Sequence, residues 1–322
     1  MDVSSFYQTM TSFTRLDVLK MCRHAALDAF PGLPLAGSLV EIFLQSHPQL
    51  LRNDNLDDAD GEDFILTDSK ECIEKFVDLY LKQRVEIVAP SKELQASTQE
   101  NFKLQCIDAI GQRIQKIEKI AHDFGIKKVA FGCSLSVDLP SPDSVETPYA
   151  ALGNQCSYLS EPMIIFTPPR LKIVVDPSIP TPTEDFVAAQ KEKNNKIKDF
   201  FTAHEMVHIA KNHTLISTIS YLAFSILATG IWVKGLQDGL SLTPLALTYG
   251  KVFGSAALFE LFFYTVRRCQ EKEADLGAIK YLETNEGAMA GLESFAERVP
   301  FIELEHPPIP ERLAYVQAKK LD

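Results

Sequence analysis

The stretch His204-Glu205-Met206-Val207-His208 has the spacing of a metal-binding helix. On a helix, residues four positions apart lie on one face, so the two imidazoles can point at one metal ion. Glu205, one position further round, faces the coordination position that the histidines leave open. We therefore expect a helix that presents two metal ligands and one carboxylate to a common centre.

A second stretch, Glu271-Lys272-Glu273-Ala274-Asp275, supplies the ligand that the first one lacks. A catalytic zinc ion takes three protein ligands and one water, and Glu271 is the candidate carboxylate on a second helix. Two neutral imidazoles and one carboxylate are a ligand set that suits zinc. The two stretches together predict one zinc ion per chain, bound by His204, His208 and Glu271.

The simplest alternative is that the HExxH pattern arose by chance and that its histidines are half-buried residues of an ordinary helix. Two observations argue against this alternative. The second stretch lies downstream at a plausible distance, and the histidines share a helical stripe with apolar residues. The stripe consists of Ile197, Phe200, Phe201, His204 and His208. We therefore expect the site on a surface that faces the core.

HExxH, two apolar stretches, ExxAD and a late His-Pro…Arg segment together resemble the zinc metallopeptidase family of HtpX and the CAAX prenyl endopeptidases, which is of the HExxH…ExxAD gluzincin type. The resemblance covers roughly residues 100–322. It implies that His204, His208 and Glu271 bind zinc and that Glu205 acts as the general base. It also implies a zincin-like fold and a role in protein processing or quality control.

Three further residues are candidates for supporting roles around the metal. Asp275 lies four positions after Glu271 on the same helix face, where it can accept a hydrogen bond from a ligand histidine; the alternative is a surface charge. The resemblance implies that His306 stabilises the oxyanion and that Arg312 braces the site. The prolines between these two residues predict a stiff, extended segment. Without the resemblance, both residues would be assigned to the surface before a C-terminal helix.

The reaction expected of this site is peptide-bond hydrolysis in protein or peptide substrates. Glu205 would take a proton from a water that zinc polarises and deliver it to the leaving amine, with no covalent intermediate. Two alternatives stay open. One is a soluble cytosolic zinc peptidase, and the other is a non-catalytic binding protein on the same fold. Loss of Glu205 or Glu271 would be the expected trace of the latter, and both residues are present.

Composition bounds the class of protein. The 322 residues are 46% hydrophobic, enough to bury a core in one large domain or in a domain with an extension. The net charge of -11 argues against a nucleic-acid partner, because phosphate binding needs a basic surface. The six cysteines form no CxxC pair and are expected to be reduced thiols. The first residues lack the basic and apolar regions of a signal peptide.

The chain is expected to divide near residue 95. Residues 1–95 are predicted to be a helical extension, and residues 96–322 the metallopeptidase domain. Apolar spacing predicts helices in the extension at Phe13–Leu27, Leu35–Leu44 and Lys70–Lys82, and the run Asn53–Asp63 reads as an acidic linker.

The metallopeptidase domain is predicted to be α+β and mostly helical, with a small sheet beside the HExxH helix. A capping-box pattern at Ser97-Thr98-Gln99-Glu100 predicts the start of a helix that Gly125 would end. Strands are expected at Val129–Val137, Tyr149–Leu159, Met163–Thr167 and Leu171–Val175, and the HExxH helix from Thr183 or Glu184. Met163–Thr167 is the candidate edge strand for an extended substrate.

An apolar helical hairpin, residues 214–266, is expected between the metal-ligand helices. Thr214–Val233 has no charge over twenty residues and ends beside Trp232, as a membrane span would. Leu245–Val266 is interrupted by Lys251 and Glu260, which have to face protein or snorkel if the stretch lies in a bilayer.

The hairpin predicts a multi-pass membrane protein whose catalytic domain faces the cytoplasm. Lys211 precedes the first apolar stretch and Arg267-Arg268 follows the second, so the positive charges lie on the side of the metal ligands. A lipid bilayer is therefore an expected partner through residues 214–266. The alternative is a cytoplasmic protein in which the two stretches pack as core helices.

Overall fold

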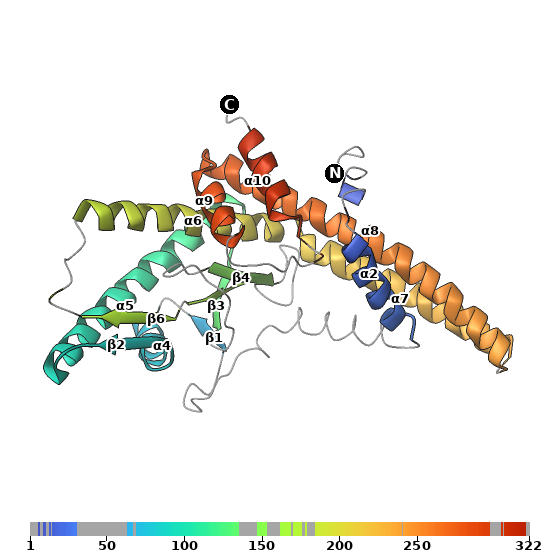
Figure 1. The fold of residues 1–322 in the computed structure, drawn as a ribbon, viewed down its shortest axis with the longest axis horizontal. Coiled ribbons are helices and arrows are strands. Elements are labelled where there is room, and N and C mark those ends of the chain that lie inside the picture. The colour runs from blue at the N-terminus through green and yellow to red at the C-terminus, as the bar shows by residue number, and fades with distance from the viewer. Residues whose placement is uncertain are drawn as a thin grey trace. The chain divides into compact units, whose positions relative to one another are not determined.

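The protein is described from a computed structural model. The structure describes residues 6, 9–10, 13, 15–30, 63–66, 69–134, 147–152, 162–168, 170–175, 178, 184–239, 241–296, 304 and 306–319. Helices make up most of the described chain, beside small sheets, which confirms the predicted fold class (Figure 1).

The elements follow one another along the chain in this order. They are α2 (Arg15–Asp28), β1 (Asp63–Leu66), α4 (Lys70–Arg84), β2 (Val85–Val88), α5 (Lys92–Asp123), β3 (Ala130–Ser134), β4 (Thr147–Leu152), β5 (Met163–Thr167), β6 (Leu171–Val174), α6 (Glu184–Ala210), α7 (His213–Gln237), α8 (Leu242–Leu282), α9 (Glu286–Ala296) and α10 (Ile309–Ala318).

The chain forms two compact units. The hairpin unit comprises residues 1–47, 212–273 and 301–308, and the sheet unit comprises residues 48–211, 274–300 and 309–322. Helix α8 passes from the first unit into the second without a break. The boundary near residue 95 is not tested by this division and stays a prediction.

The sheet unit contains a four-stranded mixed sheet in the order β1-β3-β5-β4. β3 and β5 pair in parallel, and β1 and β4 pair antiparallel on either side. β2 and β6 form a separate parallel pair. The strand predicted at Met163–Thr167 is therefore confirmed, but its assignment to an edge is wrong, because β5 is paired on both sides. Buried Ile164 and Phe166 identify a strand without revealing how many neighbours it has.

Helix α5 begins earlier than the capping-box pattern predicts. Its N-cap is Ser91, whose hydroxyl accepts a hydrogen bond from the backbone N–H of Leu94 at 3.2 Å. The predicted start at Ser97 is wrong because an earlier serine already satisfies the first N–H groups. The predicted end is confirmed: Gly125 follows the C-cap with φ 74°, a left-handed conformation that suits glycine.

The N-terminal predictions are confirmed in part. α2 and α4 lie where helices were expected at Phe13–Leu27 and Lys70–Lys82. The helix expected at Leu35–Leu44 and nearly all of the acidic linker lie outside the described residues. Strands β1 and β2 were not predicted, and β1 extends the main sheet with residues from before position 95.

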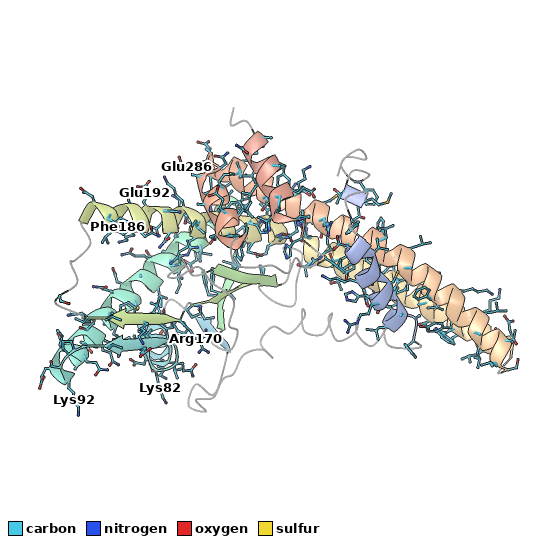
Figure 2. The ribbon with its side chains drawn as sticks, viewed as in Figure 1. Lys82, Lys92, Arg170, Phe186, Glu192 and Glu286 are labelled. Carbon is cyan, nitrogen blue, oxygen red and sulfur yellow. The ribbon has the colours of Figure 1, made fainter. Side chains whose placement is uncertain are left out.

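Helix α6, which carries the HExxH stretch, begins at Glu184 as predicted. Helix α9 packs closely on it, because a Cβ on Gly287 would overlap the carbonyl of Lys196. Lys196 also pairs with Glu192 on its own helix and with Glu286 at the start of α9. Figure 2 labels these two carboxylates on α6 and α9. These two carboxylates raise the pKa of Lys196. The contacts of Lys196 with Gly287 and Glu286 orient α6 against α9 within the sheet unit.

The helices of the hairpin unit are α7 and the part of α8 up to Glu273, with α2 lying along them. At one end of α2, the indole N–H of Trp232 donates to the carbonyl oxygen of Ala29 at 2.9 Å, and the Tyr249 hydroxyl donates to that of Ala26 at 3.2 Å. Ala26 belongs to the last turn of α2 and Ala29 directly follows the helix, where carbonyl groups lack intrahelical donors. The aromatic side chains of the hairpin therefore cap α2.

Candidate metal centre

Helix α6 points both histidines of the HExxH stretch into the core. His204 and His208 are buried, and so are the apolar residues that share their stripe. Ile197, Phe200 and Phe201 are each less than a tenth exposed, as the helical spacing predicts. The stripe of the sequence is thus a buried face of the helix.

The two histidines meet the carboxylate of α8 at one point. The ligand atoms of His204, His208 and Glu271 all lie within 4.8 Å of one another, and all three residues are buried. The Nε2 atoms of the two histidines are 3.1 Å apart. Zinc–nitrogen bonds of about 2.0–2.1 Å in a tetrahedral site place two nitrogens roughly 3.3 Å apart. The donor set therefore fits zinc in both chemistry and spacing.

Asp275 fixes the tautomer of the first ligand. Its Oδ1 lies 2.9 Å from Nδ1 of His204. An ionised carboxylate only accepts hydrogen bonds, so the imidazole donates through Nδ1–H. Nε2 of His204 is then left with a lone pair that is directed at the centre. Glu271 precedes Asp275 by one helical turn on α8, so the same helix positions both carboxylates.

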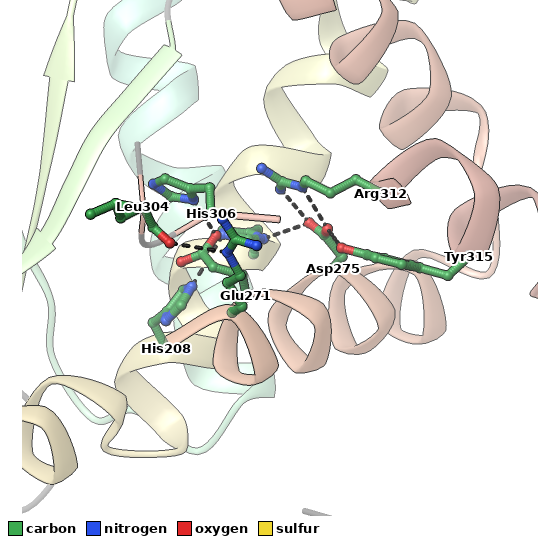
Figure 3. Close-up of polar contacts among 9 residues, drawn as sticks. His208, Glu271, Asp275, Leu304, His306, Arg312 and Tyr315 are labelled. Carbon is green, nitrogen blue, oxygen red and sulfur yellow. Dashed lines mark hydrogen bonds and ion pairs between the residues drawn. The ribbon is translucent and has the colours of Figure 1, made fainter. Parts of the chain in front are cut away.

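Asp275 is fully buried and holds the C-terminal helix against the centre (Figure 3). Arg312 donates to it twice, from Nε at 2.8 Å and from Nη2 at 2.6 Å, and the Tyr315 hydroxyl donates to Oδ2. Burial by itself would raise the pKa of Asp275. The Arg312 guanidinium and the His204 hydrogen bond outweigh burial and hold this pKa well below its usual range.

Tyr315 is a site residue that sequence reasoning missed. It lies three positions after Arg312 on α10, so the two side chains share one helix face. The prediction of an extended segment up to Arg312 is wrong, because α10 begins at Ile309. Pro310 is tolerated there, since a proline in the first helical turn removes an N–H that has no intrahelical acceptor.

His306 contacts the third ligand. Its Nδ1 lies 2.7 Å from Oε2 of Glu271, so the imidazole donates to the carboxylate, and its side chain is 40% exposed (Figure 3). This contact orients Glu271. The predicted role of His306 at the oxyanion stays a prediction, and it would use the other ring nitrogen.

Glu205 differs from the rest of the HExxH stretch in its exposure. It is partly exposed, whereas His204, Met206, Val207 and His208 are buried. A general base needs such a position, because it has to reach both the attacking water and the leaving amine of a substrate. Its assignment as the base stays a prediction.

Contacts behind α6 hold the metal-binding helix in place. Arg113 of α5 donates to Asp199 at 3.1 Å and to the carbonyl oxygen of Lys198 at 2.9 Å. On the side of α8, a Cβ on Gly277 would lie 2.8 Å from Val207. Sequence reasoning missed these supports, because neither residue belongs to a motif.

Residues 193–320 match Peptidase family M48. Neither the curated proteins nor the solved structures with which the chain was compared yielded a match. The matched residues include every predicted site residue and carry a zinc metallopeptidase domain, whose reaction is peptide-bond hydrolysis. The match is narrower than the predicted resemblance over residues 100–322.

Proposed function

From the Peptidase family M48 domain in residues 193–320, we propose that the chain is a membrane-associated zinc endopeptidase that acts on protein substrates. The observation that carries the proposal is the buried cluster of His204, His208 and Glu271. These residues would hold the zinc ion. Glu205 would be the general base, because it lies between the two histidines in the HExxH stretch and is partly exposed.

The residues around the cluster have separate roles in the proposed hydrolysis. When bound, a zinc ion would act as a Lewis acid, which polarises a carbonyl group and lowers the pKa of water. Glu205 accepts a proton from the attacking water and delivers it to the leaving amine. Asp275 keeps Nε2 of His204 unprotonated, and His306 holds the carboxylate of Glu271. No covalent intermediate with the protein is needed.

The edge strand β4 is the better candidate for binding an extended substrate. Among the described strands, β4 pairs with β5 alone, and it contacts α6. A strand with one free edge can pair with a peptide backbone through main-chain hydrogen bonds. We therefore propose that the substrate adds to β4 and lies next to the HExxH helix.

Replacement of Glu205 tests the proposed activity. Glu205→Gln removes the base and keeps the shape of the side chain, so we expect zinc binding to persist while single-turnover cleavage of an unfolded protein falls by at least about 100-fold. Glu192→Gln, on the exposed part of the same helix, is the matched control and should cleave like the wild type. Cleavage by Glu205→Gln at the wild-type rate would contradict the proposal.

The apolar helices support membrane association. α7 and α8 are long and apolar enough to cross a bilayer. Only 28% of the most apolar stretch of α7 and 22% of that of α8 are buried within the protein. The core helices of a soluble protein would be mostly buried. The exposed apolar side chains on these two helices are Ile216, Ile219, Ile226, Leu227, Val233, Leu236, Leu242, Leu247, Leu258 and Phe262.

The positions of the basic residues beside the apolar helices indicate which side of the membrane the metallopeptidase domain faces. Lys211 precedes α7 and Arg267 follows the apolar part of α8, so we propose that the metallopeptidase domain faces the cytoplasm. Both termini should then be reached by reporters from the cytoplasm. The connection between α7 and α8 should be reached only from the opposite side.

One observation favours a soluble cytosolic peptidase instead. α2 lies along the hairpin, and its exposed residues include Arg23 and His24, the latter with Nδ1 2.7 Å from the Tyr264 hydroxyl. Charged side chains are costly in hydrocarbon. Alkaline carbonate washing separates the two proposals. Retention in the membrane pellet supports the inserted hairpin, and full release without aggregation supports the soluble peptidase.

A further inference from the structure

Arg268 is a buried charge that the mechanism above does not use. It lies on α8, three positions before Glu271, and only 1% of its surface is exposed. Among the residues that the structure describes, Arg268 has the largest side chain that is fully buried. Burying a guanidinium is costly unless the surrounding groups pair with it. Its partners therefore identify what the buried charge holds together.

Among the described residues, Arg268 has partners in two segments at opposite ends of the chain. Its Nη2 lies 3.3 Å from Oδ2 of Asp17 on α2, and its guanidinium carbon lies 4.0 Å from the centre of the Phe13 ring. Its Nε donates to the carbonyl oxygen of Leu304 at 3.0 Å. A charge pair, a cation–π contact and a backbone hydrogen bond thus converge on one side chain.

The Leu304 contact leads to the metal centre. Leu304 lies two positions before His306, which donates to Glu271 at 2.7 Å (Figure 3). Arg268 and Glu271 are three positions apart and share one face of α8. α8 therefore holds this short segment at two points, Leu304 through Arg268 and His306 through Glu271. Loosening the first point frees the segment to move at the second.

We propose that Arg268 is a positioning residue through which the N-terminal helix α2 supports the metal centre. Asp17 and Phe13 orient the guanidinium, the guanidinium holds the Leu304 carbonyl, and the segment then keeps His306 on Glu271. The N-terminal extension is by this account part of the metallopeptidase site. The proposal rests on the proposed role of Glu271 as a zinc ligand, whereas the contacts themselves do not depend on zinc.

Zinc affinity, measured by competition with a chelator, tests the proposal. Arg268→Lys keeps the positive charge but loses the planar guanidinium group with its several N–H donors. Asp17→Asn leaves Arg268 in place but removes its anionic partner. We expect each variant to bind zinc about tenfold more weakly, the scale of losses beyond the direct ligands. Asp28→Asn is the matched control, because Asp28 lies on the same helix and accepts its hydrogen bond from Tyr221 instead. It should bind zinc like the wild type.

The His306→Ala background separates positioning from a general loss of stability. If Arg268 acts through His306, then Arg268→Lys should cause no further loss of zinc affinity once His306 is absent. An equal loss in both backgrounds, an equal loss in Asp28→Asn, or no loss in either Arg268→Lys or Asp17→Asn would overturn the proposal. Asp17→Asn covers the case in which Arg268→Lys fails to fold.

The failure of the proposed function can be told apart from the failure of this inference. A wild-type protein that binds no zinc would contradict the proposed function. Whether Arg268 positions His306 can then still be tested on the zinc-free protein, by urea unfolding of the wild type, Arg268→Lys, His306→Ala and the double variant. Coupled effects of the two substitutions on the unfolding equilibrium support the positioning role, and additive effects overturn it.

Discussion

Asp275 is the residue on which most contacts of the site depend. It accepts hydrogen bonds from His204, Arg312 and Tyr315, and it is fully buried. Removal of one partner from such a group leaves the others with an unmet hydrogen bond or an uncompensated charge. The carboxylate thereby links the tautomer of a metal ligand to the position of α10.

Asp275→Asn is expected to lower zinc affinity by about 10- to 100-fold, because the amide no longer compensates the Arg312 charge or enforces the His204 tautomer. Competition with a chelator measures the change. Glu273→Gln, two positions earlier on α8 and 46% exposed, makes the same chemical change away from the ligands and should have no effect. Equal zinc affinity in wild type and Asp275→Asn would remove Asp275 from the account of the site.

The residues of the centre differ in how far the sequence reveals them. Glu271 follows from the ExxAD stretch, which supplies the third ligand that zinc needs. His204 and His208 follow from spacing, because helix geometry alone brings residues i and i+4 together. Asp275 follows for the same reason. Tyr315 could have been found only by recognising α10 across Pro310. Arg113 and Arg268 could not be found, because their contacts join residues that are far apart in the sequence.

At the scale of elements, α8 serves both units. One helix of 41 residues contains the second apolar stretch, Arg268, Glu271 and Asp275. The sequence predicts the apolar stretch and the ExxAD helix separately, because charges at Arg267 and Arg268 mark a boundary in hydropathy. The backbone continues regardless, since charged residues are compatible with a helix. The pairing of β5 on both sides was likewise beyond what residue pattern can reveal.

Gly277 tests the close approach of α8 to α6. Gly277→Ala places a methyl group 2.8 Å from Val207, so we expect overpacking to destabilise the protein by about 1–3 kcal/mol. Gly111→Ala on α5 is the matched control. Its new methyl group meets nothing within 4 Å, and the helix propensity of alanine should stabilise the protein by about 0.5–1 kcal/mol. Urea unfolding measures both changes, and equal shifts of the same sign would contradict the close packing.

At the scale of the whole molecule, the sequence predicts which helices and strands form better than it predicts how they pack together. It predicts a mostly helical α+β protein with an apolar hairpin, because periodicity records local structure. It does not predict that strand β1 joins β3 or that α2 lies along α7 and α8. Those pairings depend on long-range packing, for which a single sequence holds no periodic signal.

Stability at high pH tests one such long-range contact. The Tyr281 hydroxyl of α8 donates to Asp123 of α5 at 2.8 Å, and burial together with this carboxylate raises the pKa of Tyr281 to about 12. A pKa raised by folding adds stability that is full below the unfolded value of about 10 and is lost as pH rises towards 12. Tyr281→Phe should therefore be less stable than wild type at pH 9, with the difference shrinking by pH 12. A difference in urea unfolding that does not change with pH would contradict the contact.

Metal analysis of the purified protein tests the central claim most directly. The account predicts one zinc ion per chain in the wild type and in Glu205→Gln, because the base is not a ligand. It predicts loss of that zinc when His204, His208 and Glu271 are all replaced by alanine. Wild-type protein without stoichiometric zinc, or a triple variant that retains its zinc undiminished, would contradict it.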